Sequence, residues 1–241
     1  ENIKEELHYV RKHTGSMSSQ IRHKQDIDVL KKRKVVDDLV SIVLPVKNSG
    51  STISDTLKSI GAQTYPNIEI IIIDDCSNDN SEEVINNWYK SYRNHSKNNC
   101  IKDLLYFKPP KEVCSPWTYN VGAYLSRGEY IAFHHDKGLS HPERIEKQVG
   151  FLKNNFMYSA VGTNCKPGGT KIRYDDKIED SYITECFNCV NINSLMVRYE
   201  QIHKTAGFNN LMQGAWDFEF IYRLLNNGYK VQNLRDVLYF E

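Results

Sequence analysis

The stretch VSIVLPVKNSGSTISDTLKSIGAQTYPNIEIIIIDDCSNDNS, Val40 to Ser81, decides the fold of this chain. It begins and nearly ends with runs rich in β-branched and aliphatic residues, Val40–Val46 and Ile68–Asp74, which are typical of strands buried on both faces of a parallel sheet. Between these runs, apolar residues starting at Ile53 recur at the i, i+4 and i+7 spacing of one helix face. The stretch therefore predicts a strand, a helix and a second strand, the repeating unit of a parallel α/β sheet.

The alternation of apolar runs with amphipathic segments continues through the rest of the chain. We therefore expect one α/β domain over residues 39–241, with a mainly parallel central sheet flanked by helices. Residues 1–38 are rich in Lys, Arg, His, Ser and Gln, and we expect a basic, partly helical lead-in or linker there. Further helices are predicted at residues 81–92, 117–126, 142–154 and 216–227, and further strands at 104–107, 129–134 and 159–163, with an apolar segment at 192–197.

Charge and composition narrow the range of partners. Lys plus Arg number 31 and Asp plus Glu number 30, so a formal net charge of +1 gives no global attraction to nucleic acid or to an anionic membrane. No apolar stretch reaches the roughly 18 to 20 residues of a transmembrane segment, and the first residues are polar, unlike a signal peptide. We expect a cytoplasmic protein. Because the sequence begins at Glu1 without Met, we also expect further domains of a longer polypeptide.

The cysteines do not form the pattern of a disulfide scaffold. Six of them are scattered over a chain of 241 residues, which favours reduced thiols. Cys186 and Cys189 have the spacing of half a zinc site, but no second CxxC or HxxxH lies nearby to complete a tetrahedron. Structural or incidental cysteines are therefore favoured over zinc.

Polar residues follow three of the predicted strands, at residues 45–48, 74–79 and 134–138. In open α/β sheets ligands bind beyond the carboxyl ends of the strands, so these clusters are expected to converge. A carboxylate in the second cluster can accept the N3–H of uracil, although Asp74 or Asp79 could instead be a capping or turn residue. Neither GxGxxG nor GxxxxGK[ST] is present, which argues against a dinucleotide fingerprint and a P-loop. A nucleotide held by carboxylates and backbone groups, without a glycine-rich phosphate cradle, is still allowed.

Three segments in the same order resemble family 2 glycosyltransferases of the GT-A fold. Residues 40–81 are similar to the opening strand, helix and second strand of that family, residues 120–152 to its middle segment and residues 192–231 to its acceptor-side segment. The resemblance covers about Leu39 to Phe240. It implies an enzyme that transfers a sugar, with inversion, from a UDP-sugar to the hydroxyl of a glycan or another acceptor.

The resemblance also implies roles for individual residues. Residues 39–138 would form the nucleotide-sugar-binding half and residues 139–241 the acceptor-side half. Asp217 falls at the general base, which takes the proton of the acceptor hydroxyl as that oxygen attacks the anomeric carbon. An alternative is that Asp217 is a first-turn helix acid favoured by the helix dipole. The implied nucleotide-sugar-binding residues are Pro45 and Lys47 in the pocket, Asp75 at the uracil, Asn120, Asp136 at the ribose and diphosphate, and Lys137.

The metal motif of the family, D-x-D, is altered in this chain. Its last carboxylate normally holds Mn²⁺ or Mg²⁺, but the triplet here is His135, Asp136 and Lys137, and an ammonium repels a divalent cation. Lys137 could pair directly with the diphosphate; His134 or His135 could form an altered metal site with Asp136; or the domain could bind without catalysis. Tyr119 stands where the family often has arginine, which removes one phosphate or base contact.

Two other functions are alternatives to the enzyme. A non-catalytic nucleotide-sugar-binding domain of a larger glycan-assembly protein is favoured by Lys137 and by the missing Met. A nucleotidyltransferase would need a loop rich in Gly and Arg after the first strand, which PVKNSGST does not supply. Residues 166–181 and 209–214 are expected to shape the acceptor side, but their sequence names neither the donor sugar nor the acceptor.

Overall fold

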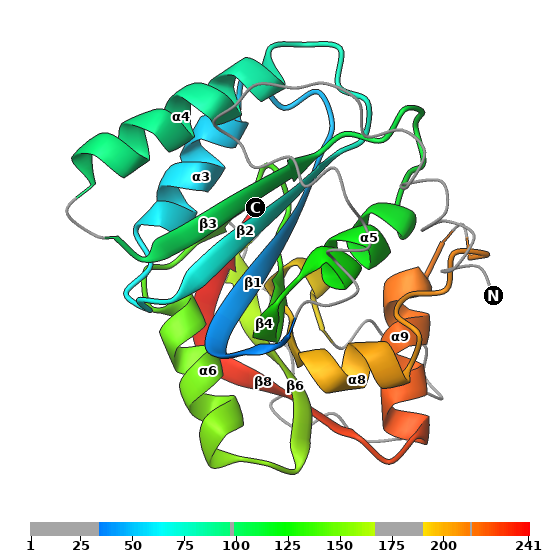
Figure 1. Cartoon of the computed structure of the whole chain (residues 1–241). Helices are drawn as coiled ribbons and strands as arrows, with labels where there is room; N and C mark the ends of the chain where they lie inside the picture. The colour runs from blue at the N-terminus through cyan, green and yellow to red at the C-terminus, as the bar shows by residue number, and fades with distance from the viewer. Residues whose placement is uncertain (1–33, 97–98, 167–189, 213) are drawn as a thin grey trace.

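A computed structural model describes residues 34–96, 99–166, 190–212 and 214–241 of the chain (Figure 1). The lead-in up to residue 33, the polar stretch from 167 onwards and the Cys186–Cys189 pair lie outside the described residues. None of the helices that the structure describes has the length and apolar character of a bilayer-spanning segment.

The described residues form one mixed sheet with helices on both faces. The strands occur in the order β3-β2-β1-β4-β7-β6-β8-β5 across the sheet. The strands are β1 (Val36–Val46), β2 (Ile68–Asp74), β3 (Ile101–Phe107), β4 (Gly128–Phe133), β5 (Leu139–Ser140), β6 (Tyr158–Lys166), β7 (Met196–Arg198) and β8 (Lys230–Phe240). The helices are α3 (Ile53–Gly61), α4 (Ser81–His95), α5 (Trp117–Leu125), α6 (Arg144–Asn154), α8 (Tyr199–Lys204) and α9 (Trp216–Asn226), with a 3-10 turn, η2 (Ile192–Ser194).

The first half of the sheet is parallel, as predicted. β1 pairs in parallel with both β2 and β4, and β2 pairs in parallel with β3. The carboxyl ends of these strands therefore lie at one edge, where the three polar clusters follow them. In the second half, β7 is antiparallel to β4 and β6, while β8 is parallel to β6. The predicted α/β fold with a mainly parallel sheet is confirmed, with antiparallel pairings confined to β5, β7 and their neighbours.

Two apolar layers hold the helices against the sheet. The predicted helical stripe of Ile53, Leu57 and Ile60 is fully buried and packs with residues of α4 and α6 against one face. Helices α5, α8 and α9 pack against the other face, where Phe133 and Phe220 belong to one continuous cluster. In Figure 1, α3 and α4 accordingly lie on the opposite side of the sheet from α5, α8 and α9. Burial of this apolar area is the main stabilising contribution to the fold.

The structure differs from the sequence predictions at several places, and β5 and α8 are among the elements that were not predicted. β1 begins at Val36, so it takes in the last residues of the segment predicted as lead-in. α6 begins at Arg144, after a turn that contains Pro142. β8 was not predicted at all. Polar residues interrupt its apolar pattern, and its pairing with β6 shifts register three times, so no regular period identifies this strand.

A buried ionic network joins the strands at the edge opposite to the polar clusters. Glu69 is 1% exposed. Its carboxylate accepts hydrogen bonds from Ser41 Oγ at 2.6 Å and from the backbone nitrogen and Nε of Arg127 at 2.7 and 2.8 Å. Arg127 Nη2 also donates to Asp103 at 2.9 Å. Because burying a carboxylate is costly unless its charge is paired, Arg127 stabilises the folded state through Glu69.

We expect Arg127→Ala to destabilise the protein by about 3 kcal/mol, because it leaves the Glu69 carboxylate buried without its cation. Urea denaturation followed by circular dichroism measures this loss. Lys58→Ala is the control: it removes an ion pair with Asp55 in which both side chains are mostly exposed, and it should have a marginal effect. Equal midpoints for the two variants would contradict the assigned role of the network.

Candidate functional site

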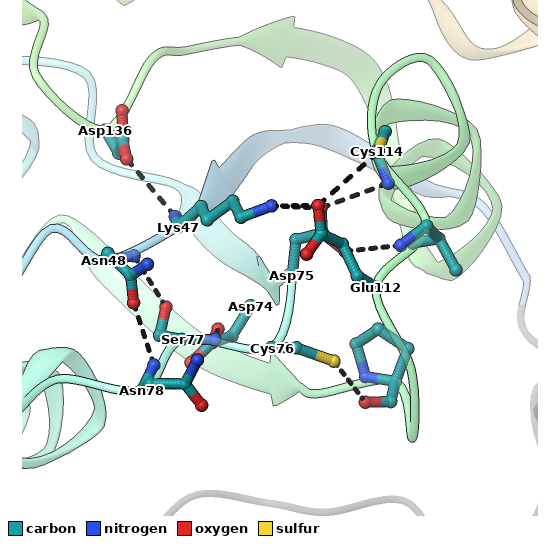
Figure 2. Close-up of polar contacts among 12 residues, drawn as sticks. Lys47, Asn48, Asp74, Asp75, Cys76, Ser77, Asn78, Glu112, Cys114 and Asp136 are labelled. Atoms are coloured by element: carbon teal, nitrogen blue, oxygen red, sulfur yellow. Dashed lines mark hydrogen bonds and ion pairs between the residues drawn. The ribbon is translucent and has the colours of Figure 1, made fainter.

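A lysine and two carboxylates meet beyond the carboxyl ends of β1 and β2. Lys47 Nζ donates a hydrogen bond to the carboxylate of Glu112, in the loop after β3, and lies 3.9 Å from Asp75 Oδ2. In Figure 2 the Lys47 side chain points toward Glu112, while its backbone nitrogen faces Asp136. The hydrogen bond with Glu112 raises the pKa of Lys47, and the same bond lowers the pKa of Glu112. This edge of the site therefore holds a permanent ammonium among carboxylates.

The Asp75 carboxylate faces the loop after β3. Asp75 is 5% exposed; its Oδ1 accepts the backbone N–H of Val113 at 2.7 Å, and its Oδ2 accepts that of Cys114 at 3.1 Å. The residue implied to bind the uracil thus also orders the neighbouring loop. Since an ionised carboxylate offers about four lone-pair sites, these two bonds leave capacity for a ligand N–H.

The turns after β1 and β2 are bound to each other. The Asn48 backbone nitrogen donates to Ser77 Oγ at 2.9 Å, and the Asn78 backbone nitrogen donates to Asn48 Oδ1 at 2.8 Å (Figure 2). Asn48, Cys76 and Cys114 have positive φ values of 50°, 60° and 62°, a region that residues with a side chain seldom adopt. Such backbone conformations persist where surrounding contacts fix them, and they gather at ligand sites.

The carboxylates of the two other aspartates of this cluster bind the backbone of the adjoining turns, in agreement with the capping or turn role that was the alternative. Asp74 is fully buried; its carboxylate accepts the backbone N–H of Ser77 at 2.7 Å and the hydroxyl of Tyr106. The carboxylate of Asp79 accepts the backbone N–H of Gly50 at 2.8 Å and that of Ser81 at 3.0 Å. Both carboxylates are used within the protein.

Asp136 connects the turn after β4 to the turn after β1. The residue is 7% exposed, and its Oδ2 accepts the Ser49 hydroxyl and the Lys47 backbone N–H, the latter at 3.3 Å. Its Oδ1 lies 3.1 Å from His135 Nδ1. The structure therefore brings together Lys47, Asp75 and Asp136. Pro45 is half-buried and lies near the end of β1, two residues before Lys47.

The two histidines of the turn differ in their surroundings. His134 is fully buried, with Nδ1 2.8 Å from the His135 carbonyl and Nε2 3.0 Å from Ser140 Oγ. Burial, with a smaller effect of the Arg144 charge, lowers the pKa of His134 to about 3, so its ring is neutral. Both ring nitrogens are engaged by the protein. Lys137, by contrast, is exposed and forms no ion pair with any residue that the structure describes.

The turn does not offer a divalent cation a fitting set of donors. Within the described turn, Asp136 Oδ1 and the half-buried ring of His135 are the donors that remain, and His135 Nδ1 is also 3.2 Å from the Lys137 backbone nitrogen. Mg²⁺ and Mn²⁺ prefer several oxygen ligands, and the neighbouring Lys137 ammonium would repel either ion. The residues present therefore do not fit the metal that the altered motif would otherwise imply.

A second group with metal-ligating atoms is occupied by a protein cation. Ligand atoms of Asp75, Glu112 and Cys114 lie within 4.8 Å of one another. The ammonium of Lys47 already binds Glu112 and approaches Asp75, so the positive charge that this group attracts comes from the chain itself. The group carries no separate metal assignment.

Asn120 connects the two halves of the domain. Its Nδ2 donates to the Phe208 carbonyl at 2.8 Å and to Asn210 Oδ1 at 2.9 Å, and its Oδ1 accepts the Phe208 backbone N–H at 2.7 Å. Gly207 has a φ of +68°, and a Cβ there would lie 2.3 Å from Asn120 Oδ1. Asn120 thus fixes the loop that precedes α9, and its implied nucleotide contact stays a prediction.

Asp217 lies in the first turn of α9, next to the aromatic cluster that covers this face of the sheet. Tyr119 is buried, donates its hydroxyl to Asn193 Oδ1 at 2.9 Å, and has its ring centroid 5.1 Å from that of Trp216. Burial raises the pKa of Tyr119, with smaller contributions from the charges of Asp136, of Glu241 and of Asp217. Tyr119 therefore lies within electrostatic reach of both Asp136 and the predicted base, Asp217.

Sequence reasoning missed Glu112 and Ser49. Glu112 follows β3, and the strand-end rule that identified the other clusters would have reached it if applied to Leu104–Phe107. Ser49 stands directly after the first cluster, but a serine in a turn gives no signal of its own. Its contact with Asp136 joins residues 87 positions apart.

Comparisons with known proteins agree with this architecture. The model of "Glycosyl transferase family 2" matches residues 41–207. The putative glycosyltransferase EpsE of Bacillus subtilis is 25% identical over 206 residues, covering 83% of this chain and 71% of that protein. The Escherichia coli protein WfaP, a UDP-Glc:alpha-D-GlcNAc-diphosphoundecaprenol beta-1,3-glucosyltransferase, is 33% identical over 125 residues, which are 51% of this chain and only 45% of WfaP.

Solved structures extend the likeness to the fold. S. aureus TarS 1–349 in complex with UDP-GlcNAc has a TM-score of 0.68 at 18% identity, covering 84% of this chain and 58% of that one. The mannosyltransferase PcManGT of Pyrobaculum calidifontis, in complex with GDP-Man and Mn²⁺, has a TM-score of 0.66 at 16% identity, covering 89% of this chain and 61% of that one. Because the family model matches well over half of the sequence, the chain belongs to glycosyl transferase family 2 and has its GT-A fold.

Proposed function

We propose that this domain transfers a sugar from a UDP-sugar to an acceptor hydroxyl with inversion, and that Lys137 takes the place of the metal ion. One observation carries the proposal: Asp75, Asp136 and the exposed side chain of Lys137 follow strands that end at one edge of the sheet. UDP and UDP-GlcNAc are bound by TarS, and WfaP is described as using UDP-Glc, which supports a uridine donor.

On the donor side, the Asp75 carboxylate would accept the N3–H of the uracil. Cytosine presents an unprotonated N3 at that position. The carboxylate would then face another hydrogen-bond acceptor, which would disfavour the binding of a cytidine nucleotide. Pro45 and Lys47 would line the pocket, and Asp136 would contact the ribose and the diphosphate. The Lys47 ammonium, already bound to Glu112, would lie beside the base.

On the phosphate side, Lys137 would pair with the diphosphate. Hydrogen bonds between an ammonium and a phosphate oxygen are charge-assisted and stronger than neutral ones. The same contact would stabilise the negative charge that develops on UDP as the bond between the anomeric carbon and the phosphate oxygen breaks. The chemical step then needs no metal ligand from this turn.

On the acceptor side, Asp217 would accept the proton of the acceptor hydroxyl. The acceptor oxygen forms a bond to the anomeric carbon from the face opposite UDP, the bond to the phosphate oxygen breaks, and UDP leaves with the electron pair. A single displacement of this kind inverts the anomeric centre. The acceptor is a glycan or another hydroxyl compound.

The alternative is a non-catalytic nucleotide-sugar-binding domain. The replacement of a metal-ligating carboxylate by Lys137 favours it. Turnover that depends on Asp217 separates the two functions.

Asp75→Ala should weaken UDP binding by about 1.5 to 3 kcal/mol, the usual contribution of a hydrogen bond to a charged group. Isothermal titration calorimetry measures the change. Asp79→Ala is a matched control, because Asp79 also follows β2 and its carboxylate also accepts two backbone N–H groups, those of Gly50 and Ser81. This variant should bind UDP as the parent does. If both variants bind UDP as the parent does, Asp75 is not at the base.

UDP binding should survive EDTA in the parent protein, because a lysine rather than a metal ion neutralises the diphosphate. Lys137→Ala should weaken binding, and Lys137→Asp should make it depend on Mn²⁺, since the substitution restores a carboxylate at the ligand position. Titrations with EDTA and with MnCl₂ measure these effects. A parent protein that binds UDP only with Mn²⁺ would refute the lysine-for-metal proposal.

Asp217→Asn should abolish sugar transfer while leaving UDP affinity nearly unchanged, because the base acts on the acceptor and contributes little to donor binding. Product formation and UDP titration on the same preparation provide the two readouts. A variant that keeps most of its turnover would show that another group accepts the proton.

A further inference from the structure

The turn that carries Asp136 and Lys137 rests on a tyrosine of the last strand. Tyr239 of β8 is fully buried, and its hydroxyl accepts the backbone N–H of His135 at 3.1 Å. Burial raises the pKa of the Tyr239 phenol, so the group is a neutral hydroxyl. A residue more than 100 positions away in the sequence thus contacts the backbone directly before Asp136.

The fit between Tyr239 and the turn is close. A Cβ added at Gly138 would lie 1.9 Å from the Tyr239 hydroxyl oxygen and 2.5 Å from its ring carbon Cζ. Gly138 does not have a positive φ, so its backbone conformation does not require glycine. Its N–H donates to the His135 carbonyl at 3.1 Å. The absence of a side chain at Gly138 therefore serves the approach of the tyrosine.

Arg144 holds Tyr239 and both ends of the turn. It is fully buried; Nη2 donates to the Phe133 carbonyl at 2.8 Å and Nη1 to Ser140 Oγ at 3.0 Å. Its guanidinium carbon lies 5.1 Å from the Tyr239 ring centroid, within the range of a cation–π contact. The guanidinium thus joins the last residue of β4, the strand β5 and the tyrosine.

A third support comes from α3. Thr56 Oγ1 lies 2.9 Å from the Asp136 carbonyl and 3.0 Å from the Gly138 carbonyl, so its single proton can serve either acceptor. The backbone on both sides of Lys137 is therefore anchored, while the Lys137 side chain itself is exposed. Anchoring of the backbone limits the directions in which that side chain can extend.

We propose that Tyr239 is a positioning residue for the donor diphosphate: by holding the His135 backbone, it fixes the direction in which Lys137 reaches the phosphates. The inference rests on the proposed role of Lys137. It predicts a selective defect, because uridine lacks phosphates and does not use Lys137. Loss of the Tyr239 hydroxyl should weaken UDP binding and leave uridine binding unchanged.

The test compares UDP and uridine affinities by calorimetry in the parent, Tyr239→Phe, Lys137→Ala and the double variant. The ratio of UDP to uridine affinity should fall about three- to tenfold in Tyr239→Phe, the range expected for one lost neutral hydrogen bond. This ratio should be no lower in the double variant than in Lys137→Ala alone, because both substitutions act through the contact between Lys137 and the diphosphate. Gly138→Ala, which displaces the hydroxyl by steric contact, should lower the same ratio.

Tyr130→Phe is the matched control. Tyr130 is also a buried tyrosine beneath an arginine, with Arg198 5.8 Å from its ring centroid, but it lies four residues before the turn, within β4. Its ratio should equal that of the parent. A normal ratio in Tyr239→Phe, or an equal loss of UDP and uridine affinity, would overturn the positioning role. An unchanged ratio in Lys137→Ala would show instead that the phosphate contact of the proposed function is wrong, and the positioning role would fall with it.

Discussion

The carboxylate of Asp136 joins the two turns on which the whole site depends. Its Oδ2 accepts the Ser49 hydroxyl and the Lys47 backbone N–H, so the turn after β4 and the turn after β1 are held at a fixed separation. Parallel pairing of β1 with β2 and β4 brings these turns to one edge of the sheet, and the carboxylate fixes how they face each other. Asp75 and Glu112 are then placed around the Lys47 side chain (Figure 2).

The proposed lysine-based site would differ in charge from a metal-dependent one. A divalent cation can neutralise both negative charges of a diphosphate, whereas one ammonium offsets about half of them. A lysine-based site should therefore hold its donor more weakly and lose affinity faster with ionic strength. The Lys47 ammonium does not make up the difference, because Glu112 already pairs with it.

Local patterns in the sequence predicted the parts of the fold that have a regular period. Each of these patterns lies within a single element: the β-branched runs within β1 and β2, and the apolar stripe within α3. The structure has a strand or a helix at each of the three predicted positions. β8 was missed because its polar residues and its shifted pairing with β6 give no period. Its Tyr239 could not be linked to the turn from the sequence, since only the folded sheet brings β5 and β8 together.

The site residues also differ in whether a local sequence pattern identifies them. The aspartates at strand ends could be named from the strand-end rule and the family resemblance, because both depend on short segments. The link between Asn120 and Phe208, and that between Ser49 and Asp136, join residues almost 90 positions apart and have no local signature. The family motif pointed to Asn120 as a nucleotide contact, whereas its observed bonds fix the loop before α9. Its neighbour Tyr119 lies among the charges of both halves.

A crystal structure of the protein with UDP, grown in the presence of MnCl₂, tests the central claim most directly. The account predicts the Lys137 ammonium within hydrogen-bond distance of a diphosphate oxygen and no manganese peak in the anomalous difference map beside Asp136. A manganese ion bound to Asp136 or His135 and to the diphosphate, with the Lys137 side chain turned away, would contradict it.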